Sequence, residues 1–438
     1  MGKNKSIVNN ILNINFLKKS VIVFLMMLVY NFSFGQNASS KIINGSGVLC
    51  GIDVLQENDF LQLRGKNIGL VTNPTGVNKN LESDIDILYN NPSVNLKCLF
   101  GPEHGIRGNS NAGNKVKGGF DEKTNLPIYS LYGRTRKPTN EMLDGLDAIV
   151  YDIQDIGCRS YTYVSTMGNI IQVAAEHGLE IIILDRPNPL GGNKIEGPIV
   201  KPGFFSFVSK YQIPYIYGLT AGELANFLVG EGFIAANAKP GFKLTIVKME
   251  GWSRSMSFED TGLIWLPTSP HIPSTQSAYL YPATGILGEL YQINIGVGYT
   301  LPFQLIGAKG VNAEVFATKL NNLHNEGVIF RPAYYTPYYG SAKGKCLGGV
   351  QIHITDLKKV NLSIIQFQAM DILHKMYPTM DVFKNAAPDR LKMFDKVCGS
   401  DIIRKTFQKS YNWKEIEPLW SADINAYTKA RLKYLLYN

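Results

Sequence analysis

Several motifs on which common enzyme classes depend are missing from this sequence of 438 residues. Only 6 histidines occur, no HExxH segment is present, and the 5 cysteines show neither a CxxC pair nor any spacing typical of zinc ligands. No GxGxxG follows a strand-like run, and neither a phosphate-binding loop nor a GxSxG segment occurs. These absences argue against a zinc enzyme, a nucleotide-dependent enzyme and a serine acyl-transfer enzyme.

Runs of basic residues are also missing, although the chain is basic overall. The formal net charge is +9, and part of that excess lies in the first 35 residues, which hold lysines but no acidic residue. Such a mild and dispersed excess gives no basis for binding nucleic acid, so we expect no nucleic-acid partner. It weakly favours an anionic polymer such as the cell wall as a partner.

The N-terminus has the layout of a secretory signal peptide. Lys18 and Lys19 precede an apolar run at 20–35 that ends in small residues. The run is short and is interrupted by Asn31, which favours a cleaved signal over the alternative of an uncleaved membrane anchor. We therefore predict a signal peptide at 1–35, export to the periplasm or beyond the cell, and no membrane span after cleavage.

The next 200 residues alternate between strand-like and helix-like patterns. Short β-branched runs at 67–73, 94–100, 147–153, 180–185 and 243–249 are bounded by turn residues, as buried parallel strands are. Helical patterns at 81–89, 165–177 and 221–229 separate several of them, and the last begins with the capping-box spacing of Thr220 and Glu223. This alternation predicts an α/β fold with a Rossmann-like, mostly parallel sheet.

A proline-rich passage at 266–281 divides the chain. Beyond it the pattern changes to a helix at 364–376, a strand at 349–355 and a closing amphipathic helix at 424–436. We therefore predict a Rossmann-like catalytic domain at 47–270 and a smaller α/β or α+β domain at 271–438.

Polar clusters follow each of the first four predicted strands. Their members are Asn73 after the first strand, Glu103, His104 and Arg107 after the second, Asp152, Asp155 and Arg159 after the third, and Asp185, Arg186 and Asn188 after the fourth. The carboxyl ends of parallel strands share one edge, where ligands bind, so we expect these side chains to converge on one crevice. The alternative roles are structural: aspartates that cap helices or pair with arginines, and a histidine that orients Glu103.

Several carboxylates beside arginines and aromatic residues fit glycoside hydrolysis. One carboxylic acid protonates the leaving oxygen, and a second group attacks the sugar or activates water. Glu103 lies in a loop rich in proline and glycine, and a rigid loop of this kind can hold the catalytic acid in position. Asp152 or Asp155 could take the second role. A metal-dependent hydrolase using Asp152, Asp155 and Asp185 is the alternative.

Three long blocks resemble the secreted exo-β-N-acetylmuramidases: FGPEHGIRG at 100–108, YDIQDIGCRSYTYVSTM at 151–167 and LDRPNPLGG at 184–192. Shorter blocks at 196–198, 218–225 and 302–308 follow in the family's order. The resemblance implies a cofactor-independent enzyme that removes N-acetylmuramic acid from the non-reducing end of peptidoglycan fragments, in a cleft between two domains. It also implies that Glu103 is catalytic. Family positions are matched by His104, Asp152, Arg159, Tyr161, Asp185 and Arg186, and Glu289 is a secondary candidate.

One segment departs from the family pattern. Val297 and Leu301 stand where many relatives carry arginine, and neither side chain can bind an anion. A muramic acid substrate would then need other cations, with Arg107, Arg159 and Arg186 as candidates. The alternatives are a different terminal amino sugar, or an envelope protein that binds glycans without cleaving them.

Overall fold

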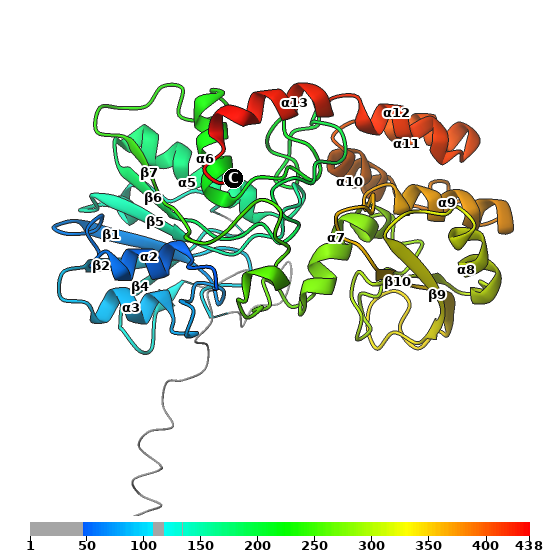
Figure 1. Ribbon diagram of the computed structural model, residues 1–438, viewed down its shortest axis with the longest axis horizontal. Coiled ribbons are helices and arrows are strands. Elements are labelled where there is room, and N and C mark those ends of the chain that lie inside the picture. The colour runs from blue at the N-terminus through cyan, green and yellow to red at the C-terminus, as the bar shows by residue number, and fades with distance from the viewer. Residues whose placement is uncertain (1–46, 108–117, 134) are drawn as a thin grey trace, which may run out of the picture. The chain divides into compact units, whose positions relative to one another are not determined.

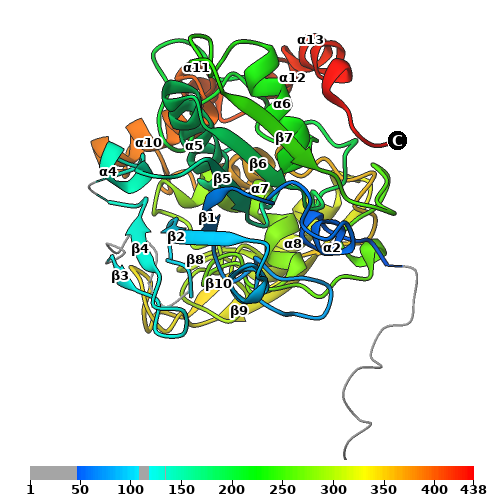
Figure 2. The same cartoon turned by 90° about the vertical axis from the view of Figure 1, so that its left-hand side faces the viewer.

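The apolar runs predicted as strands form one sheet. The structure is a computed structural model that describes residues 47–107, 118–133 and 135–438. The predicted signal peptide and Gly108 lie outside the described residues. The strands of this first sheet are β1 (Asn67–Thr72), β2 (Asn95–Gly101), β3 (Gly119–Phe120), β4 (Pro127–Ser130), β5 (Ala148–Asp152), β6 (Glu180–Leu184) and β7 (Lys243–Val247). Their order is β3-β4-β2-β1-β5-β6-β7, and only β3 runs antiparallel to its neighbour, so the α/β prediction is confirmed (Figures 1 and 2).

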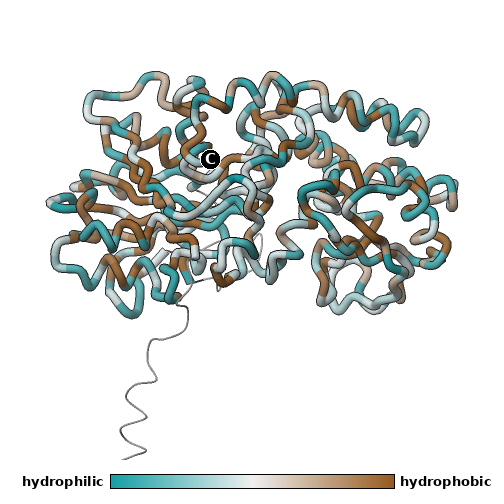
Figure 3. Tube along the Cα trace, viewed as in Figure 1, coloured by the Kyte–Doolittle hydropathy of each residue, from teal (hydrophilic) through white to brown (hydrophobic). Residues whose placement is uncertain are grey.

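Helices cover both faces of this sheet because successive strand residues point to opposite sides. Ile149 and Tyr151 of β5 pack in the core under α5 and α6, whereas Ala148 and Val150 pack in the core under α2 and α3. The helices are α2 (Gly51–Glu57), α3 (Asp84–Asn90), α4 (Asn140–Leu143), α5 (Tyr163–His177) and α6 (Ala221–Gly230). Both strand faces are therefore apolar, and Figure 3 shows the hydrophobic segments gathered along the central strands.

The predicted capping box at α6 is confirmed. The Glu223 amide donates to the Thr220 hydroxyl at 3.2 Å, and the Thr220 amide donates to the Glu223 carboxylate at 3.1 Å. These two bonds satisfy amides that an α-helix leaves unpaired at its first turn, typically worth about 1 kcal/mol. The helix therefore begins at the residue that the sequence indicates.

The second part of the chain surrounds an antiparallel sheet of order β8-β10-β9. Its strands are β8 (Leu305–Ala308), β9 (Val328–Tyr335) and β10 (Leu347–Ile354), the last of which confirms the predicted strand. The helices of this part are α7 (Thr275–Gly288), α8 (Ala313–Asn321), α9 (Ile365–Met376), α10 (Pro388–Cys398), α11 (Ile402–Ser410) and α12 (Trp413–Ser421). Helix α9 confirms the predicted helix at 364–376.

The closing helix is shorter than predicted. Helix α13 (Ile424–Arg431) passes into the 3₁₀ turn η2 (Leu432–Tyr434) instead of continuing to residue 436. This segment packs against the first sheet: the hydroxyl of Tyr427 donates to the carbonyl of Tyr217 at 2.8 Å, and Figure 1 shows α13 near α6. No helix in the described ranges is long and apolar enough to cross a bilayer.

Candidate active site

Glu103 lies in a tight loop that leaves the end of β2. The residues after it turn sharply, since His104 and Gly105 have φ values of 75° and 76°. The hydroxyl of Thr162, at the start of α5, donates to the Glu103 carboxylate at 3.0 Å. The Tyr132 hydroxyl also bonds to Glu103, and burial followed by this bond raises the pKa of Tyr132 to about 12. The half-buried carboxylate is therefore held by hydroxyls from two other segments.

A cleft of about 940 Å³ opens in front of Glu103. Four of the predicted site residues line it: Glu103, His104, Tyr161 and Glu289. The opposite wall comes from the second part of the chain, from α7 and from the segments that flank β8 and β10. Its size suits a ligand of one or two sugar rings. The cleft therefore brings Glu103 together with Glu289, which lies nearly 200 residues later in the sequence.

Aromatic rings form a continuous wall of this cleft. Tyr161 meets Tyr163 and Tyr281 edge to face, with centroids 5.0 and 5.8 Å apart, and Tyr281 meets Phe303 at 4.8 Å. The Tyr161 hydroxyl donates to the Thr268 hydroxyl at 2.7 Å, which fixes the ring. Rings with an apolar face and a satisfied hydroxyl are well suited to contacting the apolar face of a sugar.

A histidine and a tyrosine join the two sides at another edge of the cleft. His271 lies before α7, and its Nε2 is 2.7 Å from the hydroxyl of Tyr339 in the β9–β10 loop. Burial lowers the pKa of His271, and the nearby His104 contributes to the same shift. The imidazole of His271 therefore loses its proton more readily than a free imidazole does.

Glu289 supplies a second carboxylate to the cleft, at the end of α7. Arg390 of α10 forms an ion pair with its side chain and donates from Nε to its backbone carbonyl at 2.7 Å. The same guanidinium lies 3.9 Å from the centre of the Tyr291 ring. Burial raises the pKa of Glu289, and Arg390 opposes that effect. Glu289 is therefore an oriented, partly desolvated carboxylate.

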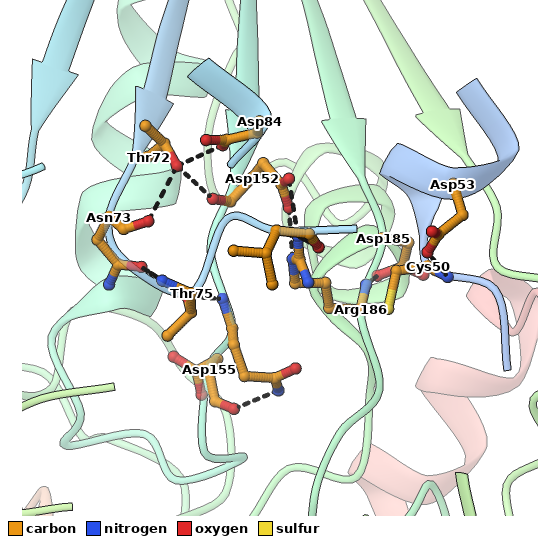
Figure 4. A network of polar contacts seen from close by, with 12 residues as sticks. Cys50, Asp53, Thr72, Asn73, Thr75, Asp84, Asp152, Asp155, Asp185 and Arg186 are labelled. Carbon is orange, nitrogen blue, oxygen red and sulfur yellow. Dashed lines mark hydrogen bonds and ion pairs between the residues drawn. The ribbon is translucent and has the colours of Figure 1, made fainter. Parts of the chain in front are cut away.

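Other predicted site residues lie in a buried network at the edge of the first sheet rather than in the cleft (Figure 4). Arg186 pairs with both oxygens of Asp152, and its Nη2 also donates to the carbonyl of Val77 at 2.9 Å. The Thr72 hydroxyl bonds to Asp84, whose pKa is raised well above its usual value by burial and then by the charge of Asp152. These charges thus bind one another and the backbone.

Asp155 and Asp185 have structural partners as well. Asp155 accepts from the Tyr217 hydroxyl at 2.7 Å and from the Gly157 amide at 2.8 Å. Asp185 accepts from the Gly222 amide at 2.8 Å and from the Thr220 hydroxyl at 2.7 Å, which places it at the N-terminus of α6. Burial raises the pKa of each carboxyl to about 6.

The remaining predicted residues bind protein groups. The guanidinium of Arg159 donates to the carbonyls of Pro198, Ile213 and Val397 at 2.6 to 2.8 Å. Arg107 donates three hydrogen bonds to the Asp121 carboxylate. Asn73 donates to the Tyr163 hydroxyl at 2.9 Å, and Asn188 donates to the Leu219 carbonyl at 2.9 Å. These four side chains are therefore bound by protein groups, and none of them lines the cleft.

The expectation of one shared crevice therefore needs correction. The strand order reverses between β1 and β5, where doubly wound sheets usually bind ligands. Here Arg186 and its partners fill that position. Of the predicted strand-end residues, only Glu103 and His104 after β2 and Tyr161 in the loop after β5 reach the large cleft. The physical reason is that carboxylates crowded in an apolar interior require a cation of their own. In the described ranges, no group of three or more potential ligands could hold a metal ion.

Much of the far wall of the cleft was not predicted. Its members include His271, Tyr281, Phe303, Lys309 and Lys345. The later sequence block at 302–308 could have indicated Phe303, but no periodic or spacing signal identifies a wall that only tertiary packing assembles.

Comparison with known proteins agrees with the sequence resemblance. The family described as exo-beta-N-acetylmuramidase NamZ matches with its N-terminal region at residues 68–276 and its C-terminal region at residues 279–437. The peptidoglycan beta-N-acetylmuramidase NamZ of Bacillus subtilis (strain 168) is 41% identical over 426 residues, which cover 96% of this chain and 100% of that protein.

Two crystal structures of DUF1343 family proteins from Bacteroides fragilis NCTC 9343 have the same fold. One has a TM-score of 0.85 and 50% identity, covering 90% of this chain and 100% of its own. The other has a TM-score of 0.71 and 28% identity, covering 89% and 99%. Sequence and fold agree over nearly the whole length, and the chain belongs to the exo-β-N-acetylmuramidase NamZ family.

Proposed function

We propose that this protein removes N-acetylmuramic acid from the non-reducing end of peptidoglycan fragments, with Glu103 as the general acid. The observation that carries the proposal is the placement of Glu103 at the wall of a sugar-sized cleft, beside a run of aromatic rings. A general acid must lie within hydrogen-bond reach of the leaving oxygen and keep a fixed orientation. Thr162 and Tyr132 provide that orientation.

The second catalytic group is Glu289 in this proposal, rather than Asp152 or Asp155. Glu289 lines the same cleft as Glu103, whereas Asp152 binds Arg186 through both oxygens and has no exposed surface. Arg390 favours the ionised form of Glu289, which is the form that activates water or attacks the sugar. The anomer released first, observed by NMR, tests whether the group acts on water or on the sugar.

Export also belongs to the proposal. Peptidoglycan lies outside the cytoplasmic membrane, and the basic and apolar pattern at 18–35 predicts a signal peptide. Expression with the native N-terminus, followed by fractionation and N-terminal sequencing, tests it. A protein found in the cytoplasm with its N-terminus intact would contradict export.

The decisive experiment is a product assay with MurNAc-β-1,4-GlcNAc. We expect the wild-type protein to release free MurNAc and Glu103→Gln to lose at least about 100-fold in kcat, because general acid catalysis contributes roughly 10²- to 10⁴-fold. Glu122→Gln, an exposed position, is the matched control and should retain activity.

Two results would contradict the proposal. Release by Glu103→Gln at the wild-type rate would remove Glu103 from the reaction. Tight binding of the disaccharide by the wild type without release would instead favour a protein that binds envelope glycans.

A further inference from the structure

The substrate of the proposed reaction carries a negative charge. N-acetylmuramic acid differs from its companion sugar by a lactyl carboxylate, so an enzyme that selects it needs a cation or strong donors at that group. Val297 lines the cleft and offers neither. The three arginines considered from the sequence bind Asp121, Asp152 and backbone carbonyls.

Two lysines provide the missing charge. Among the described residues that line the cleft, Lys309 and Lys345 are the only lysines or arginines. Lys309 directly follows β8, and Lys345 lies two residues before β10. These strands are antiparallel neighbours in which Ala308 pairs with Gly348, so the two lysines leave the same end of adjacent strands.

Both side chains are exposed and available to a ligand. Within the part of the chain that the structure describes, neither ammonium forms an ion pair with a carboxylate. The Lys345 ammonium donates to the Ser341 carbonyl at 3.3 Å, which leaves two of its three donors for other partners. Two neighbouring positive charges without an acidic partner favour an anion between them.

We infer that Lys309 and Lys345 bind the lactyl carboxylate of the terminal sugar and so determine specificity for it. The inference rests on the proposed function, because it assigns a substrate group to the same cleft. An ammonium group is a point charge and lacks the planar set of donors with which a guanidinium binds a carboxylate. We therefore expect the two lysines to affect mainly the affinity for the carboxylate of the substrate.

The test compares two substrates and four proteins. The substrates are MurNAc-β-1,4-GlcNAc and its derivative with the lactyl carboxylate converted to the methyl ester. The proteins are wild type, Lys309→Met/Lys345→Met, Lys309→Arg/Lys345→Arg and the control Lys343→Met, which removes an exposed lysine of the same loop outside the cleft lining.

We expect the double methionine variant to raise KM about tenfold for the acid substrate and to leave the ester unchanged, because exposed charge pairs contribute a few-fold each. The double arginine variant should retain the preference for the acid, and Lys343→Met should behave as wild type. Added salt should raise KM for the acid in the wild type.

The outcomes separate the two ideas. Equal KM for acid and ester in the wild type, with release of the sugar from both, would overturn the lysine assignment and leave the proposed function intact. No release from either substrate would overturn the proposed function and the inference with it.

Discussion

A single residue, Arg186, connects three segments at the carboxyl ends of the strands of the first sheet. It follows β6, pairs with Asp152 at the end of β5, and donates to the carbonyl of Val77 in the loop after β1. Both charged side chains are almost fully buried, so each would be costly in that environment without the other. The pair explains why charged residues stand at strand ends that do not face the cleft.

The first stability prediction concerns this pair. Arg186→Met should lower the free energy of unfolding by about 3 to 5 kcal/mol, because it leaves a buried charge without a partner. Asp152→Asn/Arg186→Met should recover part of that loss, since no charge then remains. Urea unfolding followed by circular dichroism measures both.

Arg64→Met serves as the control, because its ion pair with Asp59 is largely exposed and should contribute about 0 to 1 kcal/mol. If Arg186→Met lowered the free energy of unfolding no more than Arg64→Met does, the buried network would not stabilise the fold.

At the scale of elements, the N-terminus of α6 combines a capping box with a buried carboxylate. Asp185 accepts hydrogen bonds from the Gly222 amide, the Thr220 hydroxyl and the Tyr437 hydroxyl. A carboxylate is favoured beside a helix N-terminus, but burial dominates here and raises its pKa to about 6. The folded protein therefore binds a proton at Asp185 more tightly than the unfolded chain does.

This shift predicts a dependence of stability on pH. The usual pKa of aspartate is about 3.9, so the favourable contribution of the protonated form is present at low pH and is lost as the pH rises through 6. Relative to Asp185→Asn, the wild-type free energy of unfolding should fall between pH 4 and pH 7 by up to roughly 3 kcal/mol. Denaturant unfolding at several pH values measures the difference.

Asp144→Asn, at an exposed position, is the matched control for that series. An equal pH-dependent difference in Asp144→Asn would remove the assignment to Asp185.

On the scale of the whole molecule, the end of the chain returns to the first sheet. Besides Tyr427, the guanidinium of Arg431 donates to the carbonyls of Gly192 and Gly218 at 2.8 and 2.6 Å. The Tyr437 hydroxyl donates to Asp185 at 2.6 Å. The segment 424–438, placed by sequence in the smaller domain, thus completes the core of the larger one.

Removal of residues 424–438 should therefore destabilise the first sheet. The loss of buried Tyr427 and of these hydrogen bonds should cost roughly 5 kcal/mol or more. Thermal unfolding of the truncated protein should begin at least about 10 °C lower. Leu432→Ala, at an exposed position of the same segment, is the control, and an unchanged midpoint after truncation would contradict this role.

The sequence by itself determined five of the seven strands of the first sheet and the loop that carries Glu103, whereas the short strands β3 and β4 were not predicted. Apolar runs of strand length and the spacing of Thr220 and Glu223 depend on local chemistry, which periodicity and capping rules describe. The signature blocks likewise identified the family, because the residues of each block and the order of the blocks can be read directly from the sequence.

Only the tertiary structure decided which charges face solvent in the cleft and which neutralise one another. Asp152 and Glu103 both lie at carboxyl ends of parallel strands of the first sheet, yet Asp152 is buried against Arg186 and Glu103 lines the cleft. Burial and partners far apart in sequence make that distinction, and Lys309 and Lys345 meet the cleft only because β8 and β10 pair. Such contacts arise from packing, which local sequence patterns do not contain.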